Sequence, residues 1–139
     1  DVEDNAYAIM RTSSGIVAMI NSSATQWRHR FNLDVNLEKG SLILGGLLTG
    51  TKSYGAETLT VVTSDPENDM GDPKEQTTLY NKDNSWASEI NLFADYILND
   101  ESVEHGSSED ALETMRLVYK IYYNDVNWRN TFSIENPED

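Results

Sequence analysis

The chain has 139 residues, of which 24 are acidic and 10 are basic, so its formal net charge is −14. This excess of acids disfavours nucleic acid and anionic membranes as partners, because phosphate groups attract lysine and arginine. The sequence has no cysteine, which excludes disulfides, thiolate zinc sites and cysteine nucleophiles and fits a reducing, cytoplasmic location. It also has no run of about 18 apolar residues, so no segment is predicted to span a membrane. Because 38% of the residues are hydrophobic, we expect a single domain over residues 1–139.

The first half of the chain is predicted to form strands. Residues 6–12 and 16–22 flank the turn Ser13-Ser14-Gly15, which is typical of a hairpin. Both strands carry apolar residues on both faces, so we expect the hairpin to be covered on both sides.

The most regular alternation follows in residues 31–38, where every second residue is apolar and is expected to face the core. These residues are Phe31, Leu33, Val35 and Leu37. Lys39-Gly40 is expected to turn the chain into a strand over residues 41–44. A third pair is expected over residues 57–63 and 76–80, joined by an acidic, proline-containing loop.

The second half is predicted to be helical. Trp86, Ile90, Phe93 and Ile97 recur at helical spacing, with Ser85 as the expected N-cap and Glu89 expected in the first turn. A second helix is expected to start at Ser107, whose hydroxyl and the carboxylate of Asp110 form a capping box, and to end near Asn124-Asp125. Strands followed by helices predict an α+β fold, with an open, predominantly antiparallel sheet and helices packed on one face.

Metal and catalytic motifs are weak in this sequence. The two histidines, His29 and His105, lack partners at zinc-ligand spacing. In the acidic run from Asp65, the sixth and twelfth positions that a calcium loop requires hold Met70 and Gln76, so a solvated loop is expected. No G-x-S-x-G, G-x-G-x-x-G or P-loop motif is present, and no carboxylate pair is singled out for glycoside hydrolysis. We assign no metal ligand and no catalytic residue.

The segment Gln26–Arg30 is the best candidate for ligand contact. Trp27 offers a flat aromatic face, and Arg28 and Arg30 offer forked donors that suit polyhydroxylated or anionic ligands. The alternative is a loop whose arginines pair with the acids of the protein itself. Trp86 has the same two interpretations, a core position in the first helix or a ligand contact.

Four segments, in order, resemble the C-terminal domain of the Gfo/Idh/MocA family of oxidoreductases. Residues 3–18 resemble its opening hairpin, and residues 31–42 resemble its G-x-K-G-x-L hairpin, although Leu37 and Glu38 replace the usual glycine and small residue. Residues 89–94 resemble its E-x-x-x-F helix, and residues 106–122 resemble its closing S-x-E-D-A-L…A-I-Y helix.

The resemblance implies part of an enzyme that uses NAD or NADP to oxidise a sugar, inositol or related polyol. The cofactor would bind to a preceding Rossmann domain that these 139 residues do not contain, so this chain alone would hold no cofactor and would be inactive. The start at Asp1 fits a cut inside such a longer protein. The sheet would supply one wall of the substrate pocket, with Trp27, Arg28, Arg30 and Trp86 as substrate contacts. Its other face would pack against a second subunit, giving a homo-oligomer.

Two further interpretations stay open. The chain can be a self-sufficient module that binds carbohydrate or another ligand, with Trp27 as its stacking platform. It can also be a purely structural dimerisation domain.

Overall fold

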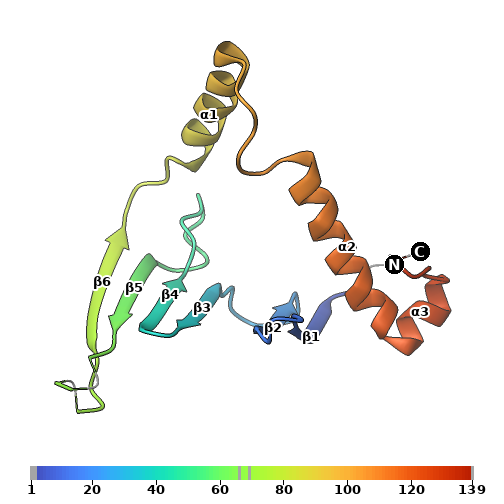
Figure 1. Cartoon of the computed structure of the whole chain (residues 1–139), viewed down its shortest axis with the longest axis horizontal. Helices are drawn as coiled ribbons and strands as arrows, with labels where there is room; N and C mark the ends of the chain where they lie inside the picture. The colour runs from blue at the N-terminus through green and yellow to red at the C-terminus, as the bar shows by residue number, and fades with distance from the viewer. Residues whose placement is uncertain (1–2, 66, 69, 139) are drawn as a thin grey trace. The chain divides into compact units, whose positions relative to one another are not determined.

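The computed structural model describes residues 3–65, 67, 68 and 70–138 (Figure 1). The described residues form six strands and three helices. The strands are β1 (Asn5–Arg11), β2 (Val17–Ser23), β3 (Asn32–Leu37), β4 (Gly40–Gly45), β5 (Glu57–Thr63) and β6 (Lys74–Tyr80), and the helices are α1 (Ser85–Asn99), α2 (Ser108–Asn124) and α3 (Val126–Phe132).

The α+β class and the open, antiparallel strand arrangement are confirmed. The strands form two sheets rather than one: β1 pairs with β2, and β3 to β6 form a four-stranded meander. The chain divides into two compact units, residues 1–22 with 90–139 and residues 23–89. The single domain expected from the length stays a prediction.

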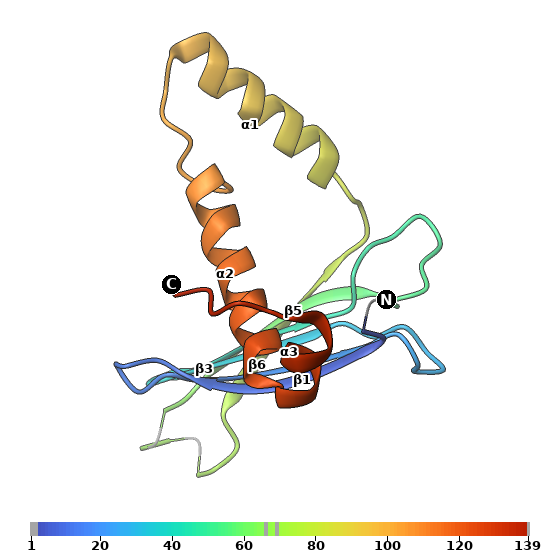
Figure 2. The ribbon, with the colours of Figure 1, turned by 90° about the vertical axis from the view of Figure 1, so that its right-hand side faces the viewer.

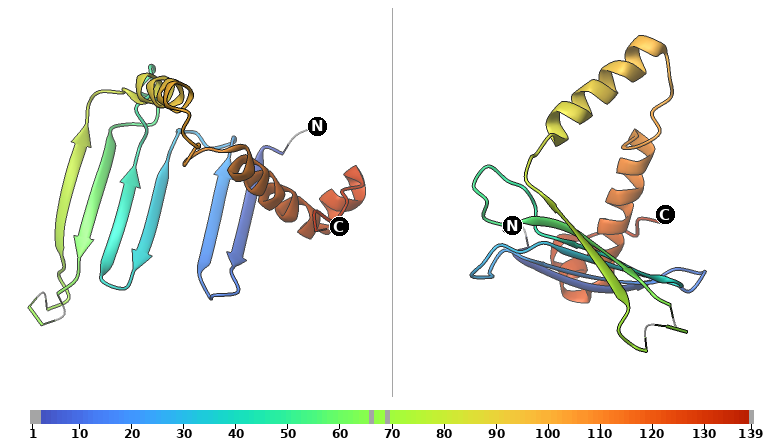
Figure 3. Two further views of the ribbon diagram at one scale, coloured as in Figure 1. Left: turned by 45° about the horizontal axis from the view of Figure 1, so that its top comes forward. Right: turned by 90° about the vertical axis from the view of Figure 1, so that its left-hand side faces the viewer.

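The four-stranded sheet is held by a regular antiparallel ladder. Leu37 pairs with Gly40 at one end, whereas Gly45 pairs with Thr58 and Glu57 pairs with Tyr80 at the other. Consequently the connections 24–31, 46–56 and 81–84 all lie at the same end of the sheet (Figure 3). The turn 38–39 and the loop between β5 and β6 lie at the opposite end. Pro66 and Asp69 of that loop fall outside the described residues.

Gly40 explains the tight turn between β3 and β4. Its φ of +151° lies in a region that side chains rarely adopt, and a Cβ there would stand 1.9 Å from the carbonyl oxygen of Val62 in β5. The structure places the turn at residues 38–39, one residue before the expected Lys39-Gly40, and Gly40 is the first residue of β4, where the close approach of the β5 backbone requires glycine.

The apolar side chains are less buried than the sequence predicts. None of the described side chains is buried in either unit. The expected core face of residues 31–37 is wrong in this respect, since Phe31, Leu33 and Leu37 are 36%, 47% and 59% exposed and Val35 is only half-buried. The physical reason is that the unit 23–89 consists of one sheet layer and the start of α1, with no second layer to cover that face.

The apolar residues of the other unit are equally open. Ile9 in β1 and Met19 in β2 are 78% and 77% exposed, and the apolar side chains of α1 are exposed along its length. The expected cover on both sides of the β1–β2 hairpin is therefore not provided within this unit. Packing of the helices on a sheet face stays a prediction.

The helix α2 begins as expected, whereas α3 is an addition. The Asp110 amide donates to the Ser107 hydroxyl and the Ser107 amide donates to the Asp110 carboxylate, so the capping box is confirmed. At the other end, Asp125 closes α2 and caps α3 by accepting from the Trp128 amide. Figure 2 shows the short helix α3 following α2 along the chain. A tilted ring contact joins the two helices, with the centroids of Tyr122 and Trp128 6.0 Å apart. Within α3 the centroids of Trp128 and Phe132 lie 4.5 Å apart.

One further contact ties the N-terminal segment to α2. The Tyr122 hydroxyl donates to Glu3 Oε1 at 2.5 Å. This hydrogen bond lowers the pKa of Glu3 and raises the pKa of Tyr122. It anchors the segment from which β1 begins.

Gly40→Ala is expected to destabilise the protein by about 3 kcal/mol, because the added methyl group meets the β5 backbone and the positive φ is strained. Gly50→Ala is the matched control, since an added Cβ at Gly50 meets nothing within 4 Å, and it should change stability by less than about 0.5 kcal/mol. Urea unfolding of both variants measures the difference. Equal stability of the two variants would contradict the register of β4 against β5.

Candidate functional site

The connection from β2 to β3 carries three of the four side chains predicted to contact a ligand. Trp27 is fully exposed, and Arg28 and Arg30 are exposed beside it. In the described part of the chain neither arginine forms an ion pair, whereas Arg116 pairs with Glu113 and Lys120 pairs with Glu138. The alternative in which these arginines neutralise the acids of the protein itself is therefore not supported.

This connection is held against the long connection between β4 and β5. The rings of His29 and Tyr54 lie with centroids 5.1 Å apart and planes inclined by 39°. The Gly46 amide donates to the Phe31 carbonyl at 3.0 Å, which extends the backbone pairing just beyond β3 and β4. At Gly46 a Cβ would stand 2.0 Å from the Ala56 carbonyl oxygen, so glycine is required where the two ends of the connection approach. The contacts place His29 and Tyr54 together at the end of the sheet.

Two residues at the start of β5 form hydrogen bonds with the backbone at the beginning of the connection between β4 and β5. A carboxylate oxygen of Glu57 accepts from the Leu48 amide at 2.9 Å, and both residues are partly buried. The Thr58 hydroxyl donates to the Gly45 carbonyl at 3.4 Å. These bonds satisfy backbone groups beyond the ladder and limit the positions that residues 46–56 can take.

Trp86, the fourth predicted contact, lies in the first turn of α1, which follows the connection 81–84 from the same end of the sheet. It is 77% exposed, so the core position that its place in the helix favoured is wrong within this unit. No ring contact joins Trp86 to Trp27 among the described residues. The fold thus brings all four predicted side chains to one end without forming a closed pocket from them.

The start of α1 also differs from the expectation. Ser85 is the first helical residue rather than the N-cap, and Glu89 lies beyond the first turn. Asp83 takes the capping role instead, because its carboxylate accepts from the Ser85 hydroxyl at 2.6 Å and from the Ser85 amide at 3.0 Å. Both bonds favour the charged form, so the pKa of Asp83 is lowered, chiefly by the hydroxyl.

Sequence reasoning missed three groups at this end: Tyr54, Lys52 and Lys82. Tyr54 and Lys52 belong to the connection between β4 and β5, and Lys82 follows β6. The strand register places them at the same end of the sheet as residues 24–31, although Lys82 follows the edge strand β6 and residues 24–31 precede the opposite edge strand β3. The sequence did contain one signal for this arrangement. The predicted strands follow one another as hairpins, and in such a meander every second connection lies at the same end of the sheet.

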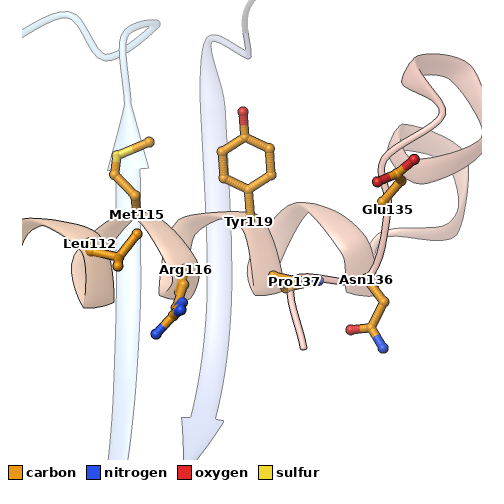
Figure 4. Close-up of a pocket in the computed structure, with 7 residues that line it drawn as sticks. All are labelled: Leu112, Met115, Arg116, Tyr119, Glu135, Asn136 and Pro137. Atoms are coloured by element: carbon orange, nitrogen blue, oxygen red, sulfur yellow. The ribbon is translucent and has the colours of Figure 1, made fainter. Parts of the chain in front are cut away.

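Each unit also contains a groove. One, of about 500 Å³, lies between α2 and the C-terminal segment and is lined by Leu112, Met115, Arg116, Tyr119 and residues 135–137 (Figure 4). The other, of about 350 Å³, lies at the opposite end of the four-stranded sheet, around Glu38, Gly40 and Val62. Neither includes a residue predicted to contact a ligand.

Two further findings concern the described part of the chain. It has no group of three or more His, Asp or Glu side chains placed to hold a metal ion. None of its helices combines the length and apolar character needed to cross a bilayer.

The capping bonds of Asp83 predict a pH dependence at the start of α1. Because the folded pKa of Asp83 lies below its ordinary value of 3.8, the carboxylate stabilises this turn above that value, and the stabilisation is lost as the pH falls through the lower folded pKa. NMR titration of the Ser85 amide should therefore show a midpoint below 3.8. Asp83→Asn should abolish this titration, and Asp95→Asn, the matched loss of a carboxylate within α1, should leave it unchanged. A midpoint at or above 3.8 would contradict the capping role.

Comparison with known proteins yields no relative for this arrangement. No family model, no curated protein and no solved structure matches the chain.

Proposed function

We propose that the chain is the substrate-binding and subunit-contact part of an NAD- or NADP-dependent oxidoreductase that acts on a sugar, inositol or related polyol. The observation that carries the proposal is the gathering of exposed Trp27, Arg28, Arg30 and Trp86 at one end of an open antiparallel sheet. Aromatic faces stack on the apolar faces of sugar rings, and guanidinium groups donate to ring oxygens and hydroxyls. The end of the sheet is open, so it provides one wall and another part of the enzyme provides the rest.

The order of the four motifs along the chain supports the same proposal. The hairpin at residues 31–42 coincides with β3, its tight turn and the start of β4, and the closing motif coincides with the capped start of α2. These matches agree in type of element with the C-terminal domain that the motifs resemble. In the proposal the protein works in the cytoplasm.

The described residues do not form a dinucleotide site of the Rossmann type. A Rossmann site needs a parallel strand followed by a glycine-rich turn and the N-terminus of a helix. Here the sheets are antiparallel, and the glycine-rich connection after β4 leads into β5. In the proposal NAD or NADP therefore binds outside this chain, and the residues named above bind and orient the polyol.

The exposed apolar side chains support the subunit-contact part of the proposal. The β1–β2 hairpin presents Tyr7 and Ile9 on one strand and Val17 and Met19 on the other, all more than half exposed. Apolar side chains gathered on a surface of this kind are typical of interfaces. A second copy of the chain is the proposed occupant.

Trp27→Ala in the intact protein that carries this chain is expected to raise the KM for glucose or myo-inositol about tenfold, because a stacking contact worth roughly 1.4 kcal/mol is lost. Trp27→Phe should keep most of the affinity because an aromatic face remains. Steady-state rates of NADH or NADPH formation measure both variants. The full-length protein is required because the proposal places the cofactor outside these residues.

Three results would contradict the proposal. Unchanged kinetics in Trp27→Ala and in Arg28→Gln would favour a purely structural dimerisation domain. Tight binding of glucose by the isolated chain, with no polyol oxidised by the intact protein, would favour a self-sufficient binding module. Tight binding of NADH by the isolated chain would contradict the assignment of the cofactor to another domain.

A further inference from the structure

The two ends of the four-stranded sheet carry opposite charge. The connections 24–31, 46–56 and 81–84 contain four lysine or arginine residues and one acid, namely Arg28, Arg30, Lys52, Lys82 and Asp83. The described residues of the connections at the opposite end contain one lysine and four acids, namely Lys39, Glu38, Asp65, Glu67 and Asp72. In a chain with 24 acids and 10 bases, four bases at one end of one sheet form a local reversal of charge. We call the connections 24–31, 46–56 and 81–84 the basic end.

The acids near the basic end are engaged with backbone groups. Glu57, at the start of β5, accepts from the Leu48 amide, and Asp83 accepts from the amide and hydroxyl of Ser85. Neither carboxylate forms an ion pair with Arg28 or Arg30, and the described residues supply no other partner of opposite charge within bonding distance. The N–H donors of both guanidinium groups are therefore available to a ligand.

The chemistry of these donors selects the kind of group. A guanidinium offers parallel N–H donors that match two oxygens of a carboxylate or a phosphate, and such charge-assisted bonds are stronger than bonds to hydroxyls. A neutral polyol would need one or two side-chain donors and an aromatic face, and it would gain nothing from four positive charges in a chain of net charge −14. The aromatic groups of the same end, Trp27 and the His29–Tyr54 pair, suit the ring of the ligand.

We infer that the substrate bound at the basic end is an acidic sugar derivative, whose carboxylate or phosphate is held by Arg28 and Arg30. This inference rests on the proposed function and narrows its substrate class. Lys52 and Lys82 raise the local positive potential, and the paired rings of His29 and Tyr54 keep the connection between β4 and β5 beside the arginines. Both arginines are binding residues that determine specificity, and neither takes part in the chemical step.

The test compares three substrates of the intact protein: glucuronate, glucose 6-phosphate and glucose. The value of kcat/KM for at least one charged sugar should exceed that for glucose by about tenfold or more, because charge-assisted bonds add to the shared ring contacts. Glucuronate and glucose 6-phosphate together distinguish a carboxylate from a phosphate as the recognised group. Raising the salt concentration should weaken binding of the charged sugar and leave glucose unaffected, since screening acts on the charged pair.

Arg28→Gln/Arg30→Gln should raise the KM for the preferred charged sugar about tenfold or more, with kcat within about twofold, and should raise the KM for glucose by a smaller factor, because glucose offers the guanidinium groups only neutral hydroxyls. Lys39→Gln, at the opposite end, is the matched control for loss of positive charge and should change neither value. Isothermal titration of the same variants with glucuronate and glucose 6-phosphate gives a second readout that does not depend on turnover.

The outcomes separate the inference from the proposed function. If glucose is oxidised as efficiently as both charged sugars, or if the double variant and Lys39→Gln behave alike, the inference is overturned and the proposed function stands. If no sugar or polyol is oxidised, the proposed function fails, and titration still decides whether the basic end binds the charged sugar. If instead the arginines hold together copies of the protein in low salt, and their replacement separates the copies, the acidic end of another copy is the occupant and the inference is overturned.

Discussion

The hydrogen-bonded ladder from β3 to β6 determines which parts of the sequence meet. Each antiparallel pairing sends the chain back along its neighbour, so the connections before β3, after β4 and after β6 share one end. Gly40 permits the tight reversal that starts this succession, and Gly46 permits the close approach where the next connection begins. The aromatic and basic side chains of the candidate site come from three separate segments, and only the strand register places these segments at the same end of the sheet.

Backbone hydrogen bonds hold this sheet together, whereas its side chains are exposed or only half-buried. The ladder and a few bonds beyond it, such as Glu57 to Leu48 and Gly46 to Phe31, satisfy polar groups without enclosing apolar ones. Burial of apolar surface is the dominant favourable term in folding, at about 25 cal/mol per Å². Burial of the exposed apolar side chains of β3 and of the β1–β2 hairpin would therefore add substantially to the free energy of unfolding. A partner that covers these side chains would add this contribution, as the proposed subunit contact requires.

Local signals in the sequence were sufficient for most elements. The alternation in residues 31–37 and the Ser107–Asp110 capping box correctly predicted β3 and the start of α2, because each depends on neighbours within a few residues. The sequence pattern does not predict the seven-residue helix α3, because the helical periodicity ends at Asn124-Asp125. In fact Asp125 both ends one helix and caps the next. Ser85 was a plausible cap by residue type, but the carboxylate of Asp83 two residues earlier takes that role.

The candidate site was partly predictable for the same reason. Trp27, Arg28 and Arg30 are adjacent in sequence, so their shared position needed no knowledge of the fold. The positions of Tyr54, Lys52 and Lys82 depend on the pairing of β4, β5 and β6, which alternation alone does not specify.

The most direct test of ligand binding at the basic end is amide hydrogen exchange of the intact protein with and without saturating glucuronate or glucose 6-phosphate. Slower exchange confined, within this chain, to residues 24–31, 46–56 and 81–84 is the predicted result. Slower exchange at residues 36–41 or 112–119 instead, where the two grooves lie, would contradict it.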